Sequence, residues 1–496
     1  MPASPPYLPD STKARRRVAD QLHAAIEAIV SERRRRGKLE PGLEDQLDAH
    51  GRTMVAMRSG PGGQRFSPPS AVTRLHRLLA RLRMPVQHDD GGEQATLRIL
   101  FVVQRYGAEV AGGAELLCRE FATRLASRGH RVEVLTSRAQ SAHDWANVYP
   151  PGHSEIDGVS VHRLGVREPR DTAAFESASV DVLWSGRLVP DSEQHAWRRL
   201  QGPDLPELEP WLRRRAGEFD VVVHFGYLYS PTWAGLPITS AVGPTVLHAT
   251  AHDEPAFWLP VFDDMFTLPT QYAWSTDEER DLLVRRGAPR SGSVIGIGVD
   301  LESRGDPERF RAGTAFGDRP YLVFVGRVEA GKGSEELIQF FEAYKGRHPG
   351  PLALVFVGPA EDHRTHPDIH YTGYVDDQTR TDVIAGAIAL VQPSFFESFS
   401  MVLTEAWAQR RPVLAQGRTE VLMGQVRRSA GGLYYRGYGE FEAALDLLTS
   451  RPDLATRLGA FGRSFVEREY RWDIVLSRYE RLLRHAVTSA SASRAG

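Results

Sequence analysis

The chain has 496 residues, of which 41% are hydrophobic and 25% charged, and its formal net charge is −2 at pH 7. This length and composition predict an ordinary globular protein of two or three domains, and the near-neutral charge gives no overall attraction to nucleic acid. No apolar run approaches the ~20 residues of a membrane span or forms a secretory signal, so we expect a cytoplasmic protein.

Residues 1–95 form a basic N-terminal extension and linker, with 16 Lys and Arg against 11 Asp and Glu. Helical patterns cover 15–36 and 70–83, and a Pro/Gly-rich stretch separates them. The second pattern places four leucines on one stripe among arginines: Leu75, Leu78, Leu79 and Leu82. We favour a helical extension packed on the main body. The alternative is peripheral contact with acidic lipid at the inner membrane face.

A first α/β domain is predicted over 96–295. An apolar strand at 97–106 leads through a glycine-rich loop into a helix at 116–129, and a strand follows at 131–137. This β-loop-α-β order builds parallel sheets. The only cysteine, Cys118, lies in that helix, cannot form a disulfide within the chain, and is expected to fill the core in a reducing compartment.

A second β/α series is predicted over 296–470, and 471–496 is expected to hold a closing helix and a disordered tail. The apolar stretches of this series are 320–328, 352–358, 369–375, 388–394 and 412–416, with helical patterns at 334–347, 377–387 and 401–410. The sequence therefore predicts two doubly wound, Rossmann-like parallel-sheet domains in series. A ligand is expected in a cleft between them.

The stretch FVGRVEAGKG, residues 324–333, nearly spells a nucleotide-triphosphate loop, but Gly333 stands where that loop has Ser or Thr to bind magnesium. Gly326 and Gly331 allow backbone N–H groups to approach an anion, and Arg327 and Lys332 add two cations. The pattern indicates a diphosphate held without metal. The alternative is an ordinary surface turn with two solvated cations.

A second stretch, PSFFESFSMVLTEAWA at 393–408, places Glu397 in the loop after a strand and Glu405 on the following helix. The helix N-terminus near Ser400 offers free N–H groups to an anion or to sugar oxygens, and a carboxylate beside it accepts hydrogen bonds from hydroxyls. The alternative is that Glu397 is an N-terminal helix charge and Glu405 a solvated side chain.

Together these residues resemble the donor site of glycosyltransferase family 4, whose members are retaining enzymes with the GT-B fold of two facing Rossmann-like domains. The resemblance covers about 97–485 and rests on the glycine-rich loop, the E-x7-E motif of Glu397 and Glu405, GGAE at 112–115 and IGIGVD at 295–300. In that family the last helix crosses back to the first domain.

The resemblance implies a role for each matching residue. Arg327 and Lys332 would bind the nucleotide diphosphate, Glu405 the ribose, and Glu397 the donor sugar near its reacting face. The other donor-binding positions it implies are Gly112 and Gly113 beside the phosphates, Gly326 in the loop, Tyr374 and Val375 near the base, and backbone groups of Ser398, Phe399 and Ser400.

The family also has a histidine after a strand of its first domain, and two candidates compete here. His248 lies within or near the strand, so we expect it to be buried. His252 falls in the following loop beside Asp253 and Glu254, and we favour it as the active-site residue. The alternative for His252 is a surface histidine paired with its acidic neighbours.

The predicted function is transfer of a sugar from a nucleotide-diphosphate sugar to an acceptor hydroxyl, with no metal and no other cofactor, since no D-x-D motif and no zinc-like Cys/His set occur. Base, sugar and acceptor stay open; the acceptor is a glycan, a lipid carrier or a small molecule. The rivals are a sugar-nucleotide epimerase of the same fold, a P-loop NTPase, which Gly333 disfavours, and a non-catalytic scaffold.

Overall fold

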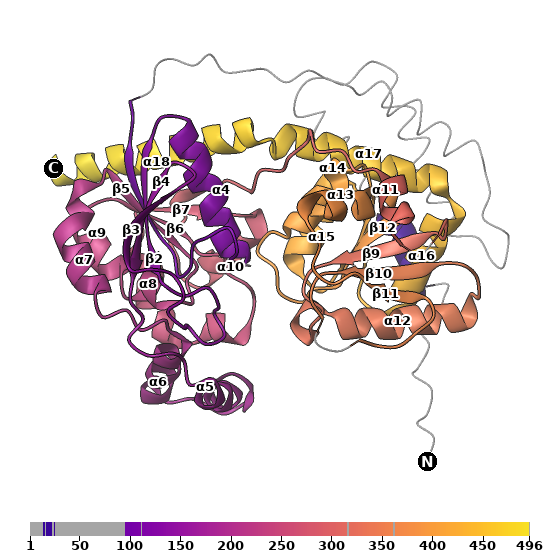
Figure 1. Ribbon diagram of the computed structural model, residues 1–496, viewed down its shortest axis with the longest axis horizontal. Coiled ribbons are helices and arrows are strands. Elements are labelled where there is room, and N and C mark those ends of the chain that lie inside the picture. The colour runs from indigo at the N-terminus through magenta and orange to yellow at the C-terminus, as the bar shows by residue number, and fades with distance from the viewer. Residues whose placement is uncertain are drawn as a thin grey trace. The chain divides into compact units, whose positions relative to one another are not determined.

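The computed structural model describes residues 13, 14, 16–21, 24, 95–110, 112–314, 317–360 and 363–495 (Figure 1). The described residues form two compact units. The first takes in the described residues of Gly92–Gly298, Phe396–Phe399 and Glu469–Gly496, and the second those of Met1–Gly91, Val299–Phe395 and Ser400–Arg468.

The first unit is built on an eight-stranded sheet of order β3-β4-β2-β1-β5-β6-β7-β8, parallel except for the pair β3 and β4. Central strands are apolar on both faces, as a sheet covered by helices on each side requires. Its strands are β1 (Arg98–Val102), β2 (Arg131–Ser137), β3 (Gly152–Ile156), β4 (Val159–Leu164), β5 (Val221–Phe225), β6 (Thr245–His248), β7 (Gln271–Trp274) and β8 (Gly292–Val294).

Helices cover both faces of this sheet. The α-helices are α4 (Gly113–Ser127), α5 (Thr172–Ser179), α6 (Asp191–Gln201), α7 (Leu208–Arg215), α8 (Ser230–Trp233), α9 (Leu236–Val242), α10 (Asp277–Arg285) and α18 (Trp472–Ala495). Shorter turns are η1 (Val180–Trp184), η2 (Ala216–Glu218), η3 (Pro255–Trp258), η4 (Pro260–Phe262) and η5 (Asp264–Thr267). Along β5, Val222 faces a cluster with Trp211 and Leu212 of α7. Phe225, of opposite parity, stacks on His248 on the other face.

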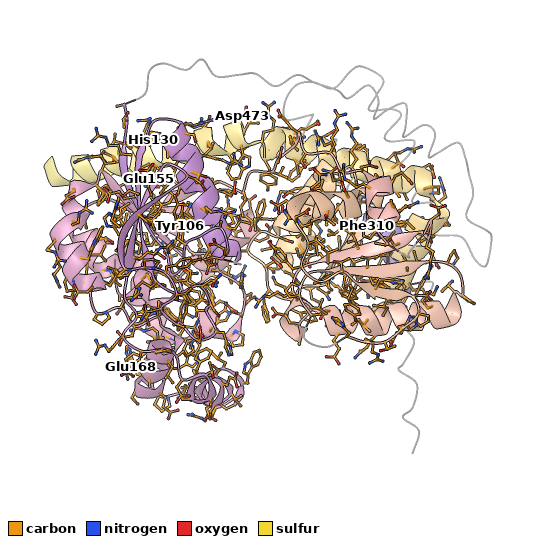
Figure 2. All side chains as sticks on the ribbon, in the orientation of Figure 1. Tyr106, His130, Glu155, Glu168, Phe310 and Asp473 are labelled. Carbon is orange, nitrogen blue, oxygen red and sulfur yellow. The ribbon has the colours of Figure 1, made fainter. Side chains whose placement is uncertain are left out.

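The last helix, α18, is part of this first unit. It packs beside α4 and against β5 to β8 (Figure 1). Tyr479 of α18 is fully buried, with its ring 4.3 Å from that of Phe121 on α4. At the amino ends of β1 and β2, His130, labelled in Figure 2, accepts the Leu97 N–H and contacts Glu480 of α18 at 3.1 Å. The helix runs to Ala495, through the segment predicted as a disordered tail.

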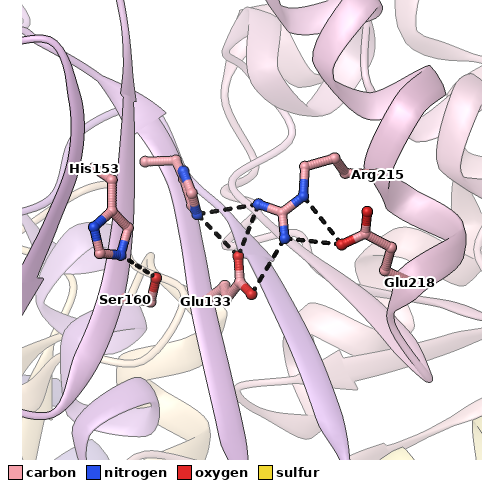
Figure 3. Close-up of polar contacts among 6 residues, drawn as sticks. Glu133, His153, Ser160, Arg215 and Glu218 are labelled. Carbon is pink, nitrogen blue, oxygen red and sulfur yellow. Dashed lines mark hydrogen bonds and ion pairs between the residues drawn. The ribbon is translucent and has the colours of Figure 1, made fainter.

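A polar network lies on the β2–β4 side of the first sheet (Figure 3). Arg215 at the end of α7 contacts Glu133 of β2 at 3.1 Å and Glu218 at 2.8 Å. The Glu133 carboxylate also contacts His162 of β4 at 2.9 Å. Burial lowers the pKa of His162 despite this carboxylate. The network therefore ties α7 to strands β2 and β4.

The second unit has a six-stranded parallel sheet of order β11-β10-β9-β12-β13-β14. Its strands are β9 (Tyr321–Val325), β10 (Ala353–Val357), β11 (Ile369–Tyr371), β12 (Ala389–Gln392), β13 (Val413–Gln416) and β14 (Gly432–Tyr435). Its helices are α11 (Pro307–Ala312), η6 (Ala330–Lys332), α12 (Ser334–Arg347), α13 (Asp377–Gly386), α14 (Met401–Ala408), α15 (Glu420–Ser429), α16 (Tyr438–Ser450) and α17 (Pro452–Glu469).

Part of the predicted N-terminal helix packs on the second unit. Val18 is buried in its core. The Gln21 side-chain amide exchanges hydrogen bonds of 2.8 and 3.0 Å with the backbone of Tyr434 in the edge strand β14. Arg17 contacts Glu440 at 2.8 Å. The second predicted helix, 70–83, lies outside the described residues.

Candidate functional site

Glycines shape the carboxyl edge of the second sheet, where the loops after β9, β10 and β11 meet. Gly326 has φ 147° and Gly358 φ 135°, conformations that favour glycine. A Cβ on Gly358 would lie 2.2 Å from the Gly326 carbonyl oxygen. The Gly326 N–H donates to Val357 and the Gly358 N–H to Gly373, both at 2.9 Å. These contacts fix the course of the loop that follows β9.

The geometry at Gly333 explains why the loop departs from a nucleotide-triphosphate motif. Gly333 has φ 70°, and a Cβ there would lie 2.2 Å from the carbonyl oxygen of Pro393, the residue after β12. A side chain at this position would therefore clash with backbone. Ser334, one step later, is buried and donates its hydroxyl to the Glu329 carbonyl at 2.9 Å. That hydroxyl closes the loop on itself, so it does not replace the missing Ser or Thr.

The two cations of this loop differ in surroundings. The Arg327 side chain is 68% exposed and lies 3.2 Å from the Glu329 carboxylate, which is 40% exposed. Such an exposed pair contributes little stability, so an anionic ligand can replace Glu329 as the partner of Arg327. Lys332 ends the turn η6 and is half-buried immediately before α12. Both cations therefore lie in the segment that joins β9 to α12.

Glu405 has an unsatisfied carboxylate oxygen. One oxygen, Oε1, lies 3.3 Å from Arg380 of α13, whereas Oε2 is buried and accepts no hydrogen bond within the described part of the chain. Burial raises the pKa of Glu405, and Arg380 lowers it by less. A buried acceptor without a donor is rare in folded proteins. A ligand hydroxyl would satisfy Oε2.

Polar side chains hold the segment between β12 and α14. Gln392 donates to the Ser400 hydroxyl at 2.9 Å and accepts from Ser394 at 3.1 Å. Thr419 donates to the Ser394 carbonyl at 2.7 Å. Ser400 itself has φ 70° at the start of α14. This frame fixes the segment that carries the first glutamate of the E-x7-E motif.

Residues 396–399 of that segment have contacts within the first unit. Thr276 donates its hydroxyl to the Ser398 carbonyl at 3.1 Å. The ring of Phe399 is 2% exposed and packs edge-on against Tyr470 at 5.0 Å. Glu397 and Ser398 are half-buried. The Phe399 ring is therefore not available to a ligand, and the predicted donor contact at this position is one through the backbone.

The two residues predicted near the base lie between β11 and α13. Tyr374 is 85% exposed and Val375 half-buried. Gly373, with φ 68°, turns the chain into this loop after β11. Tyr374 is therefore accessible to a ligand, beside the same glycine edge.

In the first unit, the loop after β1 contains an ion pair that the sequence did not predict. Arg105 and Glu115 are both buried, with their charged atoms 2.6 Å apart. A Cβ on Gly112 would lie 2.1 Å from the Glu115 carboxylate, so this position accepts only glycine while the ion pair is kept. Gly113, the first residue of α4, has open space around it. Residues Gly112 and Gly113 therefore form a small-residue surface at the start of α4.

The two histidines differ as expected in burial. His248 is 1% exposed, stacks on Phe225 at 4.7 Å, and has its pKa lowered to about 3 by burial. It is an uncharged core residue. His252 lies in the loop after β6 with its side chain 33% exposed and its Nδ1 3.6 Å from Glu254. Of the two, only His252 is accessible, and the pairing with Glu254 was the alternative expected for it.

Glu279 of α10 supports the loop of His252. Its carboxylate accepts the Ala251 N–H at 2.8 Å and the Ser275 N–H at 2.6 Å. The residue is 1% exposed, and burial raises its pKa to about 7 despite these hydrogen bonds. No motif in the sequence singles out this glutamate, because its partners are backbone groups of Ala251 and Ser275.

Within the described ranges, no group of three His, Cys, Asp or Glu side chains is arranged to hold a metal ion. No helix among the same residues is both long and apolar enough to cross a membrane. Cys118 is fully buried, which confirms its expected role in the core.

The chain is similar in sequence to known glycosyltransferases. Residues 306–465, which include both glutamates and both loop cations, match the family model described as glycosyl transferases group 1. A D-inositol 3-phosphate glycosyltransferase of Streptomyces scabiei is 24% identical over 83% of this chain and 92% of its own. These matches support a glycosyltransferase. A glycogen synthase of Mycobacterium tuberculosis is also 24% identical, over 76% of this chain and 92% of its own.

Solved structures show the GT-B fold for this glycosyltransferase. Sucrose-phosphate synthase from Thermosynechococcus elongatus aligns with a TM-score of 0.60 at 17% identity, over 79% of this chain and all of that one. HepE of Anabaena, solved with UDP and glucose, aligns with a TM-score of 0.57 at 14% identity, over 78% of this chain and all of its own. The expected α/β class and GT-B fold are confirmed.

Proposed function

We propose that this glycosyltransferase belongs to family 4 and is a retaining, metal-independent enzyme that transfers a sugar from a nucleotide-diphosphate sugar to an acceptor hydroxyl. The observation that carries the proposal is the unsatisfied Oε2 of Glu405, on the helix that follows the E-x7-E loop. A ribose hydroxyl would donate the hydrogen bond that this oxygen lacks. Relatives solved with UDP or UDP-glucose support a nucleotide donor of this kind.

Arg327 and Lys332 have the charge that a departing diphosphate needs. As the bond between the sugar C1 and the phosphate oxygen breaks, negative charge grows on the diphosphate, and cations fixed beside it lower the energy of that state. Gly333 stands where a magnesium-binding hydroxyl would be, so the proposal gives the neutralising role to the two side chains.

The remaining steps follow the mechanism assigned to the resembled family. The acceptor oxygen forms its bond to C1 on the face from which the diphosphate departs, and the acceptor proton passes to the leaving phosphate oxygen. In this proposal Glu397 orients the donor sugar, and His252 is the histidine that supports it. Gly112 and Gly113 are the proposed small residues for the donor phosphates and the acceptor.

The test is release of nucleoside diphosphate from UDP-, GDP- and ADP-sugars in the presence of EDTA, with and without candidate acceptors. Lys332→Ala and Glu397→Ala should lower release at least a hundredfold, because each removes a group acting on the transition state. Arg364→Ala is the matched control, since Arg364 is also exposed and paired, with Glu342, in the second unit.

Three outcomes would contradict parts of the proposal. Loss of release in EDTA that Mn²⁺ or Mg²⁺ restores would overturn metal independence, and inversion at C1 in the product, measured by NMR, would overturn retention. A changed sugar nucleotide formed without acceptor would indicate an epimerase. Absence of both release and nucleoside diphosphate binding would leave a non-catalytic protein of this fold.

A further inference from the structure

A basic pocket lies in the first unit, where α18 crosses the edge of the sheet. It has a volume of about 660 Å³ and is lined by residues of the β7–β8 edge and of α18. Figure 1 shows α18 running along this sheet, and α18 contacts both strands. The size is within the range of small-molecule sites.

The charge of this pocket is one-sided. Its ionisable lining groups are Arg290, Arg478, Arg481 and His485, and its lining contains no acidic residue. Arg478 is paired with Glu469 at 2.7 Å. In the described part of the chain, Arg290 and Arg481 make no ion pair and no hydrogen bond. Two guanidinium groups therefore have their full hydrogen-bonding capacity available to a ligand.

The neutral lining groups are hydrogen-bonding ones. Ser291 and Ser293 contribute hydroxyls from the β8 strand and the residue before it, and Gln271 contributes an amide at the start of β7. Hydroxyl, amide and guanidinium groups are all donors. A ligand rich in acceptor oxygens and carrying negative charge fits this set.

The pocket is separate from the candidate donor and acceptor residues. Gln271 and Gly292 are the first residues of β7 and β8, so the pocket lies at the amino ends of these parallel strands. Ligands that react in α/β proteins bind at the carboxyl ends. In this unit the carboxyl ends carry Gly112 and His252, which are absent from the pocket lining.

We infer that this pocket binds a phosphoryl group at a site distinct from the sugar-transfer site. Guanidinium groups bind phosphate through paired N–H···O hydrogen bonds, which a single lysine charge does not reproduce. The shared chemistry fits two sources, a small phosphorylated metabolite and the headgroup of an anionic phospholipid. The inference does not depend on the proposed retaining mechanism or on the identity of the donor.

The first arm of the test uses inorganic phosphate as probe and the full chain. Calorimetric titration should show saturable binding to the wild type that is at least tenfold weaker in Arg290→Gln/Arg481→Gln. Arg327→Ala/Lys332→Ala should keep it, which separates the pocket from the donor loop. Arg484→Gln is the matched control, because Arg484 is on the same helix but donates to the Ala95 carbonyl and is absent from the lining.

The second arm uses sedimentation with phosphatidylcholine vesicles that contain phosphatidic acid. Association lost in Arg290→Gln/Arg481→Gln and kept in Arg484→Gln identifies a lipid headgroup, whereas saturable binding of free phosphate without vesicle association identifies a soluble ligand. Equal binding by wild type and double variant in both arms, or no binding in either, overturns the inference.

A second variant that keeps both positive charges tests the inference if Arg290→Gln/Arg481→Gln does not fold. Arg290→Lys/Arg481→Lys keeps both charges and removes the paired geometry, so we expect phosphate affinity between those of wild type and glutamine variant. Release of nucleoside diphosphate from the donor should be the same in all these pocket variants. A lysine variant that binds phosphate as tightly as the wild type would contradict recognition by guanidinium geometry.

Discussion

The most informative single residue is Glu405, whose carboxylate oxygen Oε2 is buried without a hydrogen-bond donor among the described residues. Its pKa is raised because burial disfavours the charged form more than Arg380 favours it. A raised pKa means that the folded state binds the proton more tightly than the unfolded state does. Stability from this group is therefore present at low pH and is lost as pH rises through the folded-state pKa.

This balance gives a prediction for Glu405→Gln. At neutral pH the variant should unfold at a higher temperature than the wild type, because it removes a buried charge and keeps the side-chain shape. Nucleoside diphosphate binding should weaken at least tenfold, because a hydrogen bond to a charged acceptor contributes roughly 1.5–3 kcal/mol. Thermal unfolding and calorimetric titration measure both. Glu335→Gln, on the exposed part of α12, is the control and should change neither.

At the scale of elements, the apolar runs predicted most central strands correctly. The strands β1, β2, β9, β10, β11, β12 and β13 all fall within predicted apolar stretches. The hairpin of β3 and β4 was missed because β3 is almost entirely exposed and has no apolar alternation. The edge strand β14 has only four residues and follows a glycine, so its pattern is too short to separate from a turn.

The candidate site was predicted where its residues are adjacent in the sequence and missed where they are not. Gly326, Arg327, Lys332 and Gly333 form one loop in the structure, as their spacing indicated. The Arg105–Glu115 pair and the support of the His252 loop by Glu279 depend on contacts between segments. A single sequence contains no signal for such contacts, since each partner taken alone is an ordinary charged residue.

Glu279 also gives a prediction about the element it anchors, the loop between β6 and η3. Its pKa of about 7 exceeds the usual carboxyl value of about 4.3, so the folded state holds its proton over a wider pH range. The unfolding free energy should fall as pH rises from about 4.3 to about 7, by an amount on the order of 3 kcal/mol, and then level off.

Glu279→Gln removes this titration, so the difference between wild type and variant isolates it from other groups. Urea unfolding at pH 4.5, 6 and 8 should show the wild type losing stability relative to the variant over that interval. Glu278→Gln, at the half-buried neighbouring position in α10, is the control. If the difference in unfolding free energy between the wild type and Glu279→Gln were the same at all three pH values, the raised pKa of Glu279 would be contradicted.

For the whole molecule, the consequential feature is that α18 belongs to the first unit although the second unit precedes it in sequence. The buried face of α18 includes Val475, Tyr479, Leu483 and Ala486, all fully buried. Tyr479 packs on Phe121 of α4 and lies 5.1 Å from His248 of β6. The core of the first unit therefore includes α18, and it is assembled from segments hundreds of residues apart.

We expect Tyr479→Ala to destabilise the first unit by about 3–5 kcal/mol, the usual cost of removing a buried aromatic ring. Urea unfolding should show the transition of the first unit at a lower urea concentration than in the wild type. The transition of the second unit should stay at the same urea concentration. Nucleoside diphosphate identifies that second transition by shifting it to higher urea, because the candidate donor residues Arg327, Lys332 and Glu405 are in the second unit.

Tyr479→Phe is the control. It keeps the ring and removes a buried hydroxyl that has no hydrogen-bond partner among the described residues, so its stability should equal or exceed that of the wild type. If Tyr479→Ala lowered both transitions equally, the two units would unfold as one cooperative body, and α18 would stabilise the molecule as a whole.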